Sequence, residues 1–321
     1  MISRLDELCD GPGTVGPLDV LHDLVAIAIA ITLGILGSRY VLATTVCVLY
    51  IGIRQRHLSN LGHECIHAKI MRSASANKML GRFITVILGE SFSPYRQSHQ
   101  IHHAKLGSAD DPMLQAYLSR RATTPVRDKR AFIVRVILGN AIWELPRSAV
   151  VTLLSRAEGE TRIATLGRGA FWAVIAVVSI ATGTLAEVVI YWVVPLVFVR
   201  PVITWITDLG NHAGVIESGD PITQTRGWTS HAVTRHLLGG HLDDMYHPIH
   251  HWCPRIPWRK LPQAAAILED GYDRWSEVPW CSGFFFRRRS TPQTPCVVDD
   301  IVARLQTPRL AQSGFRKSHP G

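Results

Sequence analysis

The stretch VLATTVCVLYIGIRQRHLSNLGHECIH, residues 41–67, joins an apolar segment to a pair of histidines and decides the class of fold. Its first part, residues 41–53, has no charged side chain, whereas its last five residues read HECIH. Residues four apart share one face of a helix, so His63 and His67 are expected to point the same way. If one helix continues past residue 53, His63 lies ~15 Å further on, at 1.5 Å per residue. The stretch therefore predicts a membrane helix whose polar end carries metal ligands just above the bilayer.

The overall composition also favours a membrane protein. Of the 321 residues, 47% are hydrophobic and only 18% are charged, against roughly 25% charged in a typical soluble domain. The mean hydropathy is +0.12 and the formal net charge is +9. A basic balance can indicate nucleic-acid binding, but this apolar content points instead to the cytoplasmic face of a membrane, and no nucleic-acid partner is expected. Six scattered cysteines without a CxxC pair argue against a disulfide framework or a cysteine zinc site.

Two pairs of apolar segments predict four membrane spans in two hairpins. The predicted spans are residues 21–37, 41–56, 168–184 and 186–206. The first pair has short apolar cores, so a single long kinked span is the alternative for it, but flanking residues can extend each helix because mismatch costs little per Å. Residues 79–88 and 131–154 are apolar stretches interrupted by charges, and they predict amphipathic helices at the interface. The expected fold is an all-α, polytopic membrane protein with a helical cap.

The basic residues predict the orientation of these spans. Residues 54–168 hold 18 lysines and arginines and residues 207–321 hold 13, out of 34 in the chain. By the positive-inside rule both segments face the cytoplasm, where they can build one site together. Residues 1–283 are expected to form the membrane domain and residues 284–321 a flexible basic tail. The acidic N-terminus predicts no cleavable signal peptide, and we expect a multi-pass protein of a bacterial inner membrane.

Fifteen histidines are unusually many, and eight of them form three clusters. The clusters read HECIH at residues 63–67, HQIHH at residues 99–103 and HPIHH at residues 247–251. Imidazole suits zinc, copper, iron and nickel, and eight imidazoles are too many for one ion but suit two. A further histidine just after the last span is a candidate ninth ligand. The predicted metal ligands are His63, His67, His99, His102, His103, His212, His247, His250 and His251.

The three clusters, in this order and between these spans, resemble the histidine boxes of the integral-membrane fatty acid desaturase and hydroxylase superfamily. The segments that carry the resemblance are GHECIH at 62–67, SHQIHHAKLGSADDP at 98–112 and MYHPIHHWCPRIPWRKLP at 245–262. The resemblance covers roughly residues 20–265 and implies a non-haem diiron centre with dioxygen as co-substrate. It also implies an extra histidine ligand outside the boxes, which supports His212, and a functional role for Asp111. Because the core and tail use up the chain, we expect no fused haem domain and therefore an external electron carrier of the ferredoxin or cytochrome type.

A metal–oxygen species is needed to remove hydrogen from an unactivated C–H bond, because ordinary side chains cannot do so. Loss of a second hydrogen gives an alkene and return of a hydroxyl gives an alcohol, and the position of the substrate decides between them. Carboxylates are expected to orient the imidazoles. The candidates are Glu64, Asp110, Asp111, Asp208, Asp243 and Asp244, of which Asp111 and Glu64 are the predicted catalytic residues. The remaining histidines near the boxes, His57, His231, His236 and His241, are expected to be orienting or surface residues.

We expect a fatty acyl, lipid-like substrate that is desaturated after entering from the bilayer through an apolar tunnel. Candidate tunnel residues are Trp143, Trp205, Trp228 and Trp252. Two alternatives within the superfamily stay open: a hydroxylase or ketolase of a lipid or terpenoid, and a desaturase of a small amino-acid-derived metabolite. The polar, histidine-rich approach to the third box keeps the last of these open.

Two alternatives come from other functional classes. The first cluster is literally HExxH, the motif of zinc peptidases, in which two histidines bind zinc and the glutamate is the base. An intramembrane peptidase leaves both HxxHH clusters unexplained, however. A metal transporter would place its ligands inside the spans, near the middle of the bilayer, whereas these clusters lie outside them.

Overall fold

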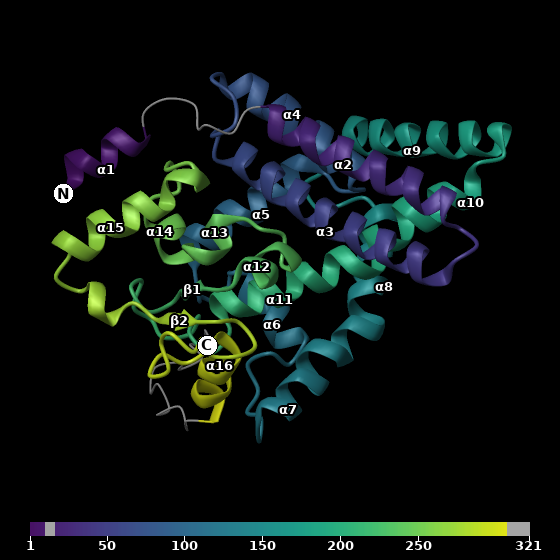
Figure 1. The fold of residues 1–321 in the computed structure, drawn as a ribbon. Helices are drawn as coiled ribbons and strands as arrows, with labels where there is room; N and C mark the ends of the chain where they lie inside the picture. The colour runs from purple at the N-terminus through teal and green to yellow at the C-terminus, as the bar shows by residue number, and fades with distance from the viewer. Residues whose placement is uncertain (10–16, 307–321) are drawn as a thin grey trace, which may run out of the picture.

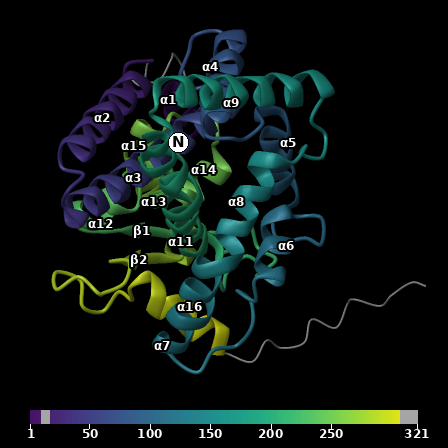
Figure 2. The same ribbon diagram turned by 90° about the vertical axis from the view of Figure 1, so that its right-hand side faces the viewer.

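Long helices form one end of the molecule and short helices form a cap at the other, as Figure 1 shows. The protein is described here from a computed structural model, over residues 1–9 and 17–306. Seen from the side in Figure 2, the helix that ends at His212 runs through the middle, with the first hairpin on one flank. The cap therefore sits on the ends of helices that begin in the apolar region.

The first hairpin consists of α2 (Pro17–Leu36) and α3 (Val41–Ile66), which pack side by side along the apolar region. Two helices joined by a short turn confirm the hairpin and exclude the single kinked span. Helix α3 continues unbroken past residue 53, as the opening stretch predicted, so His63 stands on the same helix as the apolar segment. Tertiary packing buries the polar half of α3, where residues 51–56 and 60–66 are all shielded from solvent.

The second pair consists of α9 (Arg162–Thr182) and a helical rod over Leu185–His212. Helix α9 ends at Gly183, whose φ of +72° is the left-handed conformation that favours glycine at a helix end. The rod is built from α10 (Leu185–Val188), π-helical turns at Val189–Val193 and Pro195–Val199, and α11 (Arg200–His212). The turn therefore lies at residues 183–184, and the rod extends beyond the predicted end at residue 206 to carry His212 into the cap.

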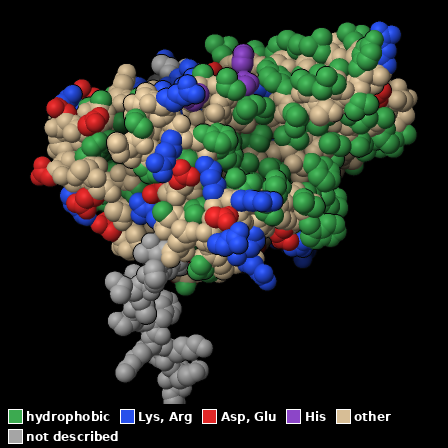
Figure 3. Space-filling model, turned by 60° about the horizontal axis from the view of Figure 1, so that its bottom comes forward, with side chains coloured by type: hydrophobic (Ala, Val, Ile, Leu, Met, Phe, Trp, Pro, Cys, Tyr) green, Lys and Arg blue, Asp and Glu red, His purple; other side chains and the backbone are tan. Residues whose placement is uncertain are grey.

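Three helical segments are long and apolar enough to cross a membrane: Pro17–Leu36, Arg162–Thr182 and Leu185–His212. The predicted span 41–56 is not among them, because only the first half of α3 is apolar. The three segments lie in the part of the molecule where Figure 3 shows hydrophobic side chains covering the surface, while charged side chains gather on the remainder. This division indicates a membrane-embedded region and a polar cap.

Two amphipathic helices form at the charge-interrupted stretches predicted over residues 79–88 and 131–154. They are α4 (Ala74–Ile87) and a helix over residues 129–154 formed by α7 (Lys129–Phe132), π-helical turns at Ile133–Leu138 and Asn140–Glu144, and α8 (Leu145–Leu154). In α4 the side chain of Ile84 is fully buried, whereas Met79 is 70% exposed. In the second helix Phe132 is buried and Ile142 is exposed. Each helix therefore buries one apolar face and presents another outward, which suits the membrane interface.

The cap contains the remaining described elements. These are α1 (Ile2–Cys9), α5 (Phe92–Lys105), α6 (Pro112–Ser119), α12 (Ala232–Leu237), α13 (Leu242–Met245), α14 (His247–Trp252), α15 (Leu261–Gly271), the 3-10 turns Trp258–Lys260 and Trp275–Glu277, and α16 (Val297–Gln306). Two short strands, β1 (Gly227–Thr229) and β2 (Trp280–Ser282), pair in parallel, with Gly227 opposite Trp280. The expected all-α architecture therefore holds apart from this one strand pair.

Phe284, Phe285 and helix α16 are packed into the cap, so the prediction of a flexible tail from residue 284 is wrong for them. The side chains of Phe284, Val297 and Ile301 are buried, and all three belong to one core cluster. Phe284 packs so closely on α11 that a Cβ at Gly210 would lie 2.7 Å from its ring. The arginine-rich composition of this segment predicts a tail, but α16 carries apolar residues on one face, and that face packs against the core. The rest of the predicted tail, residues 307–321, lies outside the described residues.

Candidate metal centre

The nine predicted histidines converge in two neighbouring groups within the cap. The five-histidine group contains His63, His67, His99, His103 and His250, and the four-histidine group contains His102, His212, His247 and His251. Within each group the nitrogen atoms that could bind metal all lie within 4.8 Å of one another. Each group therefore has the compactness that a single ion requires.

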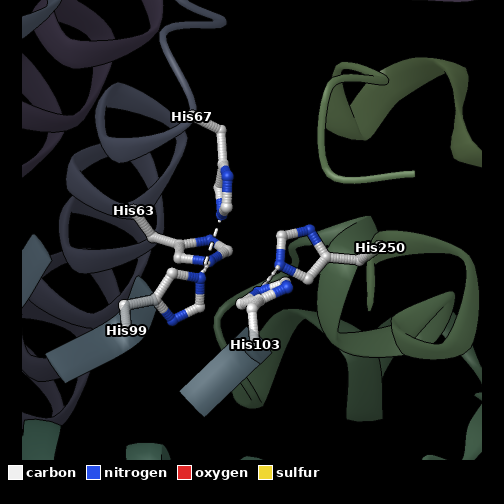
Figure 4. Close-up of side chains that lie close together, drawn as sticks. All are labelled: His63, His67, His99, His103 and His250. Carbon is white, nitrogen blue, oxygen red and sulfur yellow. Dashed lines mark hydrogen bonds between the residues drawn. The ribbon is translucent and has the colours of Figure 1, made fainter. Parts of the chain in front are cut away.

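The five-histidine group is built from three segments of the chain (Figure 4). Helix α3 and the residue after it supply His63 and His67, and their rings point toward those from α5 and α14. The Nε2 atom of His99 lies 2.9 Å from the Nε2 atoms of both His63 and His67. The Nε2 atoms of His103 and His250 lie 3.2 Å apart. Five imidazole nitrogens thus face a common centre.

The four-histidine group also takes its members from α5 and α14, and it adds one histidine from α11. The Nε2 atom of His212, at the end of α11, lies 2.8 Å from that of His247 and 3.2 Å from that of His102. The Nε2 atoms of His247 and His251 lie 3.1 Å apart. Without His212 this group would have only three members, so the predicted ninth histidine completes it.

Helical spacing explains how two helices serve both groups. On α5 the i,i+4 pair His99 and His103 belongs to the five-histidine group, whereas His102, at i+3, belongs to the four-histidine group. On α14 the roles are reversed: His247 and His251 enter the four-histidine group, while His250 enters the other. The two groups are adjacent, because the rings of His103 and His251 stack with their centroids 4.2 Å apart.

The donor set fits metal ions and is hard to explain without them. Burial, assisted by the neighbouring histidines, lowers the pKa of His67 to about 3, that of His103 to about 2 and that of His247 to about 3. These rings are therefore neutral at pH 7 and can each offer a lone pair. Two nitrogens bound to one ion at about 2.1 Å lie about 3.0 Å apart when they meet at right angles. The Nε2 spacings of 2.8 to 3.2 Å match that value.

Asp243 orients the five-histidine group. Its Oδ2 atom accepts a hydrogen bond from Nδ1 of His63 at 2.9 Å, and its Oδ1 atom accepts another from His241. Burial acts to raise the pKa of Asp243, but His241 and His63 hold it well below its ordinary value. A carboxylate is an acceptor only, so His63 must carry its proton on Nδ1 and turn the lone pair of Nε2 toward the group. The backbone carbonyl of Asp243 likewise lies 3.2 Å from Nδ1 of His247.

Asp111 has the corresponding place beside the four-histidine group. Its Oδ1 atom accepts from Nδ1 of His102 at 2.8 Å, which again turns the lone pair of Nε2 inward. The same carboxylate caps α6 by accepting from the backbone N–H of Met113, and it also accepts from that of Gly107. Asp111 is fully buried and held by these contacts. The structure therefore gives this predicted catalytic residue the geometry of a positioning residue.

Glu64, the other predicted catalytic residue, is also buried, and its carboxylate is not a member of either histidine group. Its Oε2 atom accepts from the backbone N–H of Trp258 at 3.3 Å, and the residue lies in a separate cluster with His63 and Asp243. Burial, and then the charge of Asp243, raise the pKa of Glu64 well above its ordinary value. Glu64 therefore ties α3 to the 3-10 turn that begins at Trp258.

The other predicted carboxylates do not touch the imidazoles. Asp110 forms an exposed ion pair with Lys105, and Asp244 forms a buried one with Arg56 at 3.0 Å. Asp208 lies four residues before His212 on α11 and borders a cavity. The prediction that these three orient the histidines is therefore wrong, because the loops and α11 turn their carboxylates elsewhere.

The four remaining histidines near the boxes are surface residues or contact carboxylates near the site, as expected. His231 and His236 are exposed, and neither belongs to a histidine group. His57 contacts Asp23 on α2, and His241 contacts Asp243. Burial lowers the pKa of His241 despite the adjacent carboxylate. His57 and His241 thus contact carboxylates near the site without belonging to either histidine group.

A cavity of about 220 Å³ borders both histidine groups, through His99 and His102. Its other walls include Tyr95, Arg120 and Asp208. Of the four tryptophans proposed as tunnel residues, Trp205 borders this cavity. Among the others, Trp143 is exposed, Trp228 is buried in the core, and Trp252 donates to the carbonyl of Pro221.

Sequence reasoning missed two of these cavity residues. Tyr95 lies four residues before His99 on α5, so the helical spacing that grouped the histidines could have found it. Arg120 lies in the segment after α6, where no motif marks it. Only the packing of that segment against α11 brings Arg120 beside the histidines.

Two comparisons with known proteins bear on this arrangement. The sequence model of the fatty acid desaturase family matches residues 40–282, a range that includes all nine histidines. A protein named dihydrorhizobitoxine desaturase, from Bradyrhizobium elkanii, is 30% identical over 289 residues, which cover 85% of this chain and 80% of that protein. The resemblance first drawn from the three histidine boxes is confirmed.

Proposed function

Because this chain belongs to the fatty acid desaturase family, we propose that it is a dioxygen-dependent oxidoreductase that introduces a double bond into its substrate. The observation that carries the proposal is the convergence of nine histidines in two adjacent groups. The overall reaction takes one dioxygen, two external electrons and two protons, removes two hydrogens from adjacent carbons, and releases two waters. Two iron ions, when bound, supply the oxidising power that side chains lack.

The two histidine groups would hold one iron each. Nitrogen ligands carry no charge, which leaves the oxidised metal pair strongly electrophilic. Asp243 and Asp111 keep His63 and His102 in the tautomer whose Nε2 lone pair points to the metal. Glu64 and the buried pair of Arg56 and Asp244 hold the surrounding helices in place. The protein thus contributes fixed ligand geometry.

The protein would act as a multi-pass membrane enzyme, with its histidine-rich cap on the cytoplasmic side of a bacterial inner membrane. Three apolar helical segments and the basic segments that flank them support this orientation. Electrons would come from a separate ferredoxin- or cytochrome-type carrier. A basic cap would attract an acidic carrier by long-range electrostatics.

Two substrate classes follow from different observations. The family match favours a fatty acyl substrate, which a membrane-embedded enzyme can take from the bilayer. The name of the relative from Bradyrhizobium elkanii denotes a desaturase whose substrate is called dihydrorhizobitoxine, and it favours a small metabolite. Hydroxylation of either substrate would use the same metal site, with return of a hydroxyl instead of loss of a second hydrogen.

The zinc peptidase alternative has less support. In the HExxH reading Glu64 is a general base, but here its carboxylate is buried and accepts a backbone N–H. The two further boxes, which a peptidase leaves unexplained, complete both histidine groups.

Metal content tests the proposal most directly. We expect detergent-purified protein, expressed with iron and zinc both available, to contain two irons per chain. His99→Ala and His250→Ala should each lower the iron content, because both belong to the five-histidine group. A single zinc that is lost with His63→Ala and unaffected by His250→Ala would overturn the proposal in favour of the peptidase.

A further inference from the structure

The cavity beside His99 and His102 has two charged side chains, Arg120 and Asp208, in a wall that is otherwise largely apolar. Its volume is about 220 Å³, below the roughly 300–1,000 Å³ of typical sites for drug-sized ligands. A neighbouring cavity of about 200 Å³ shares three wall residues with it: Arg120, Trp205 and Asp208. These three residues therefore stand where a molecule approaching the metal centre would meet the protein.

Arg120 is a fixed cation without a carboxylate partner. Its guanidinium lies 5.4 Å from the ring centroid of Trp205, within the range of a cation–π contact. Trp205 is in turn held by a 2.9 Å hydrogen bond from Nε1 to the carbonyl of Val136. One terminal nitrogen of Arg120 donates to Ser148 at 3.3 Å, and its Nε has no hydrogen-bond partner within the described chain. The guanidinium is thus positioned without a salt bridge in the described part of the chain, and it interacts with Asp208 at longer range.

The carboxylate of Asp208 has no salt bridge and no hydrogen-bond donor within the described residues, although the charges of Arg56 and Arg120 act on it. The hydrogen bond that the structure gives this residue from a side chain runs from Tyr117 to its backbone carbonyl, not to its carboxylate. The neighbouring buried carboxylates differ, because Asp111, Asp243 and Asp244 each have several partners. Among these acids Asp208 borders the cavity, where its carboxylate can contact a ligand.

We propose that this cavity binds a small zwitterionic substrate of the α-amino acid class. Arg120 binds the carboxylate and Asp208 the ammonium group, and the side chain of the substrate extends toward His99 and His102. The proposal rests on the desaturase function given above and names its substrate class. Two C–H hydrogens leave, a C=C bond forms, and dioxygen with two electrons and two protons from the external carrier and solvent becomes two waters.

An acyl chain fits this cavity poorly. It would remove water from Arg120 and Asp208 without offering either a partner, and burying unpaired charges is strongly unfavourable. A third cavity, of about 430 Å³, is suited to acyl chains, since it lies among α2, α9 and α10 and its lining includes Ile31 and Phe171. None of the nine histidines borders that cavity. Lipid there would be remote from the chemistry.

The test presents both substrate classes to the same iron-loaded, full-length protein. The protein is reduced chemically and exposed to dioxygen with a panel of L-norleucine, L-2-aminoheptanoate and O-ethyl-L-homoserine, or with dipalmitoyl phosphatidylcholine vesicles. Mass spectrometry then records products two hydrogens lighter. We expect products from the free amino acids, and at least ~10-fold less from their N-acetyl or methyl ester derivatives, because each derivative loses one charged contact.

Variants and a binding measurement link the result to the cavity. Arg120→Gln and Asp208→Asn should each raise the KM for the amino acid by ~10-fold or more with little change in iron content. Arg121→Gln and Asp273→Asn, at exposed neighbouring and distant positions, are the matched controls. Equilibrium dialysis of radiolabelled L-norleucine, L-2-aminoheptanoate and O-ethyl-L-homoserine should show saturable binding of at least one of them that Arg120→Gln weakens by a similar factor.

The failures of the two proposals can be told apart. Oxidation of the vesicle lipid at a rate that Arg120→Gln does not change would overturn the substrate class and leave the desaturase function standing. Two irons per chain with no saturable binding of any amino acid in the panel would also overturn the substrate class alone. Protein without iron after expression with iron available would overturn the function and this inference with it.

Discussion

The two histidine groups have similar geometry but different support. Four of the five members of the five-histidine group come from the first two histidine boxes, at the end of α3 and on α5, and the third box adds His250. The four-histidine group depends on His212, which belongs to no box and arrives on α11. One group therefore has a ligand to spare, and the other does not. The histidine boxes therefore supply every member of the five-histidine group, whereas the four-histidine group also needs a histidine outside the boxes.

The contacts that hold the two histidine groups in place differ as well. His63 is oriented by a carboxylate, whereas Nδ1 of His212 lies 3.3 Å from the backbone carbonyl of Gln224. The end of α11 is braced by the buried Arg226, which donates to the carbonyls of Gly210 and Ala213. Arg226 in turn forms an ion pair with Asp300 on α16 at 2.7 Å. The four-histidine group thus depends on a C-terminal segment that composition alone assigned to a tail.

Removal of His212 should have the largest effect. His212→Ala leaves three nitrogens in a group of four, so we expect the iron content to fall from two per chain to about one. Activity should fall by more than the about 10–100-fold that loss of an orienting residue costs. Elemental analysis and a desaturation assay measure both effects, with the exposed His236→Ala as control. Retention of both irons would contradict the assignment of His212 as a ligand.

Removal of His67 should have a smaller effect and so sharpen the contrast. His67 is half-buried, lies just beyond α3, and leaves four nitrogens behind in its group. We expect His67→Ala to retain most of its iron when purified quickly and to lose it faster than the wild type during dialysis against a chelator. If His67→Ala loses iron as completely as His212→Ala, the two groups are equally dependent on each ligand, and the contrast fails.

Loss of an orienting carboxylate should rank third. In Asp111→Asn the side-chain amide can present either an oxygen or an N–H to His102, so the tautomer of the ring is no longer dictated. We expect activity or iron affinity to fall about 10–100-fold. Asp110→Asn, at the adjacent exposed position, should leave iron affinity unchanged. An equal loss in both variants would mean that the segment, not its contact with His102, matters.

The smallest effect on activity should come from removing the ion pair between Arg226 and Asp300. Asp300→Asn removes the partner of Arg226, which keeps two carbonyl acceptors, so we expect the free energy of unfolding to fall by about 2 kcal/mol. Iron should then be lost selectively from the four-histidine group on mild heating. Thermal unfolding with parallel iron analysis measures both quantities. Equal loss of both irons would show that α16 stabilises the whole cap without favouring one group.

The same ion pair predicts a pH dependence of stability. Burial acts to raise the pKa of Asp300, but Arg226 and Arg304 hold it below the ordinary value. The pair therefore stabilises the protein fully above the unfolded pKa of about 3.9, and the contribution is lost as pH falls through the lower folded value. Unfolding monitored between pH 6 and pH 3 should show this loss in the wild type and not in Asp300→Asn.

Much of the site could be read from the sequence because its signals are local. Spacings of three and four residues place histidines on one side of a helix wherever that helix lies, so the three boxes and their metal-binding role follow directly. The apolar segments are local signals too, since about 20 apolar residues in a row suffice for a span. Asp111 was found through the resemblance of its motif, and the structure places it against His102.

The remaining features depend on contacts between distant segments, which no local pattern encodes. The division of each HxxHH box between two groups follows from the packing of α5 against α14, and the completion of one group follows from the length of α11. The burial of α16 arises because its apolar side chains meet the end of α11. Arg120 and Asp208 lie 88 positions apart in the chain, and they face one cavity because the chain folds back on itself. Periodicity therefore identifies ligands on each helix, whereas the packing of helices decides which ligands share an ion and what the cavity beside them can bind.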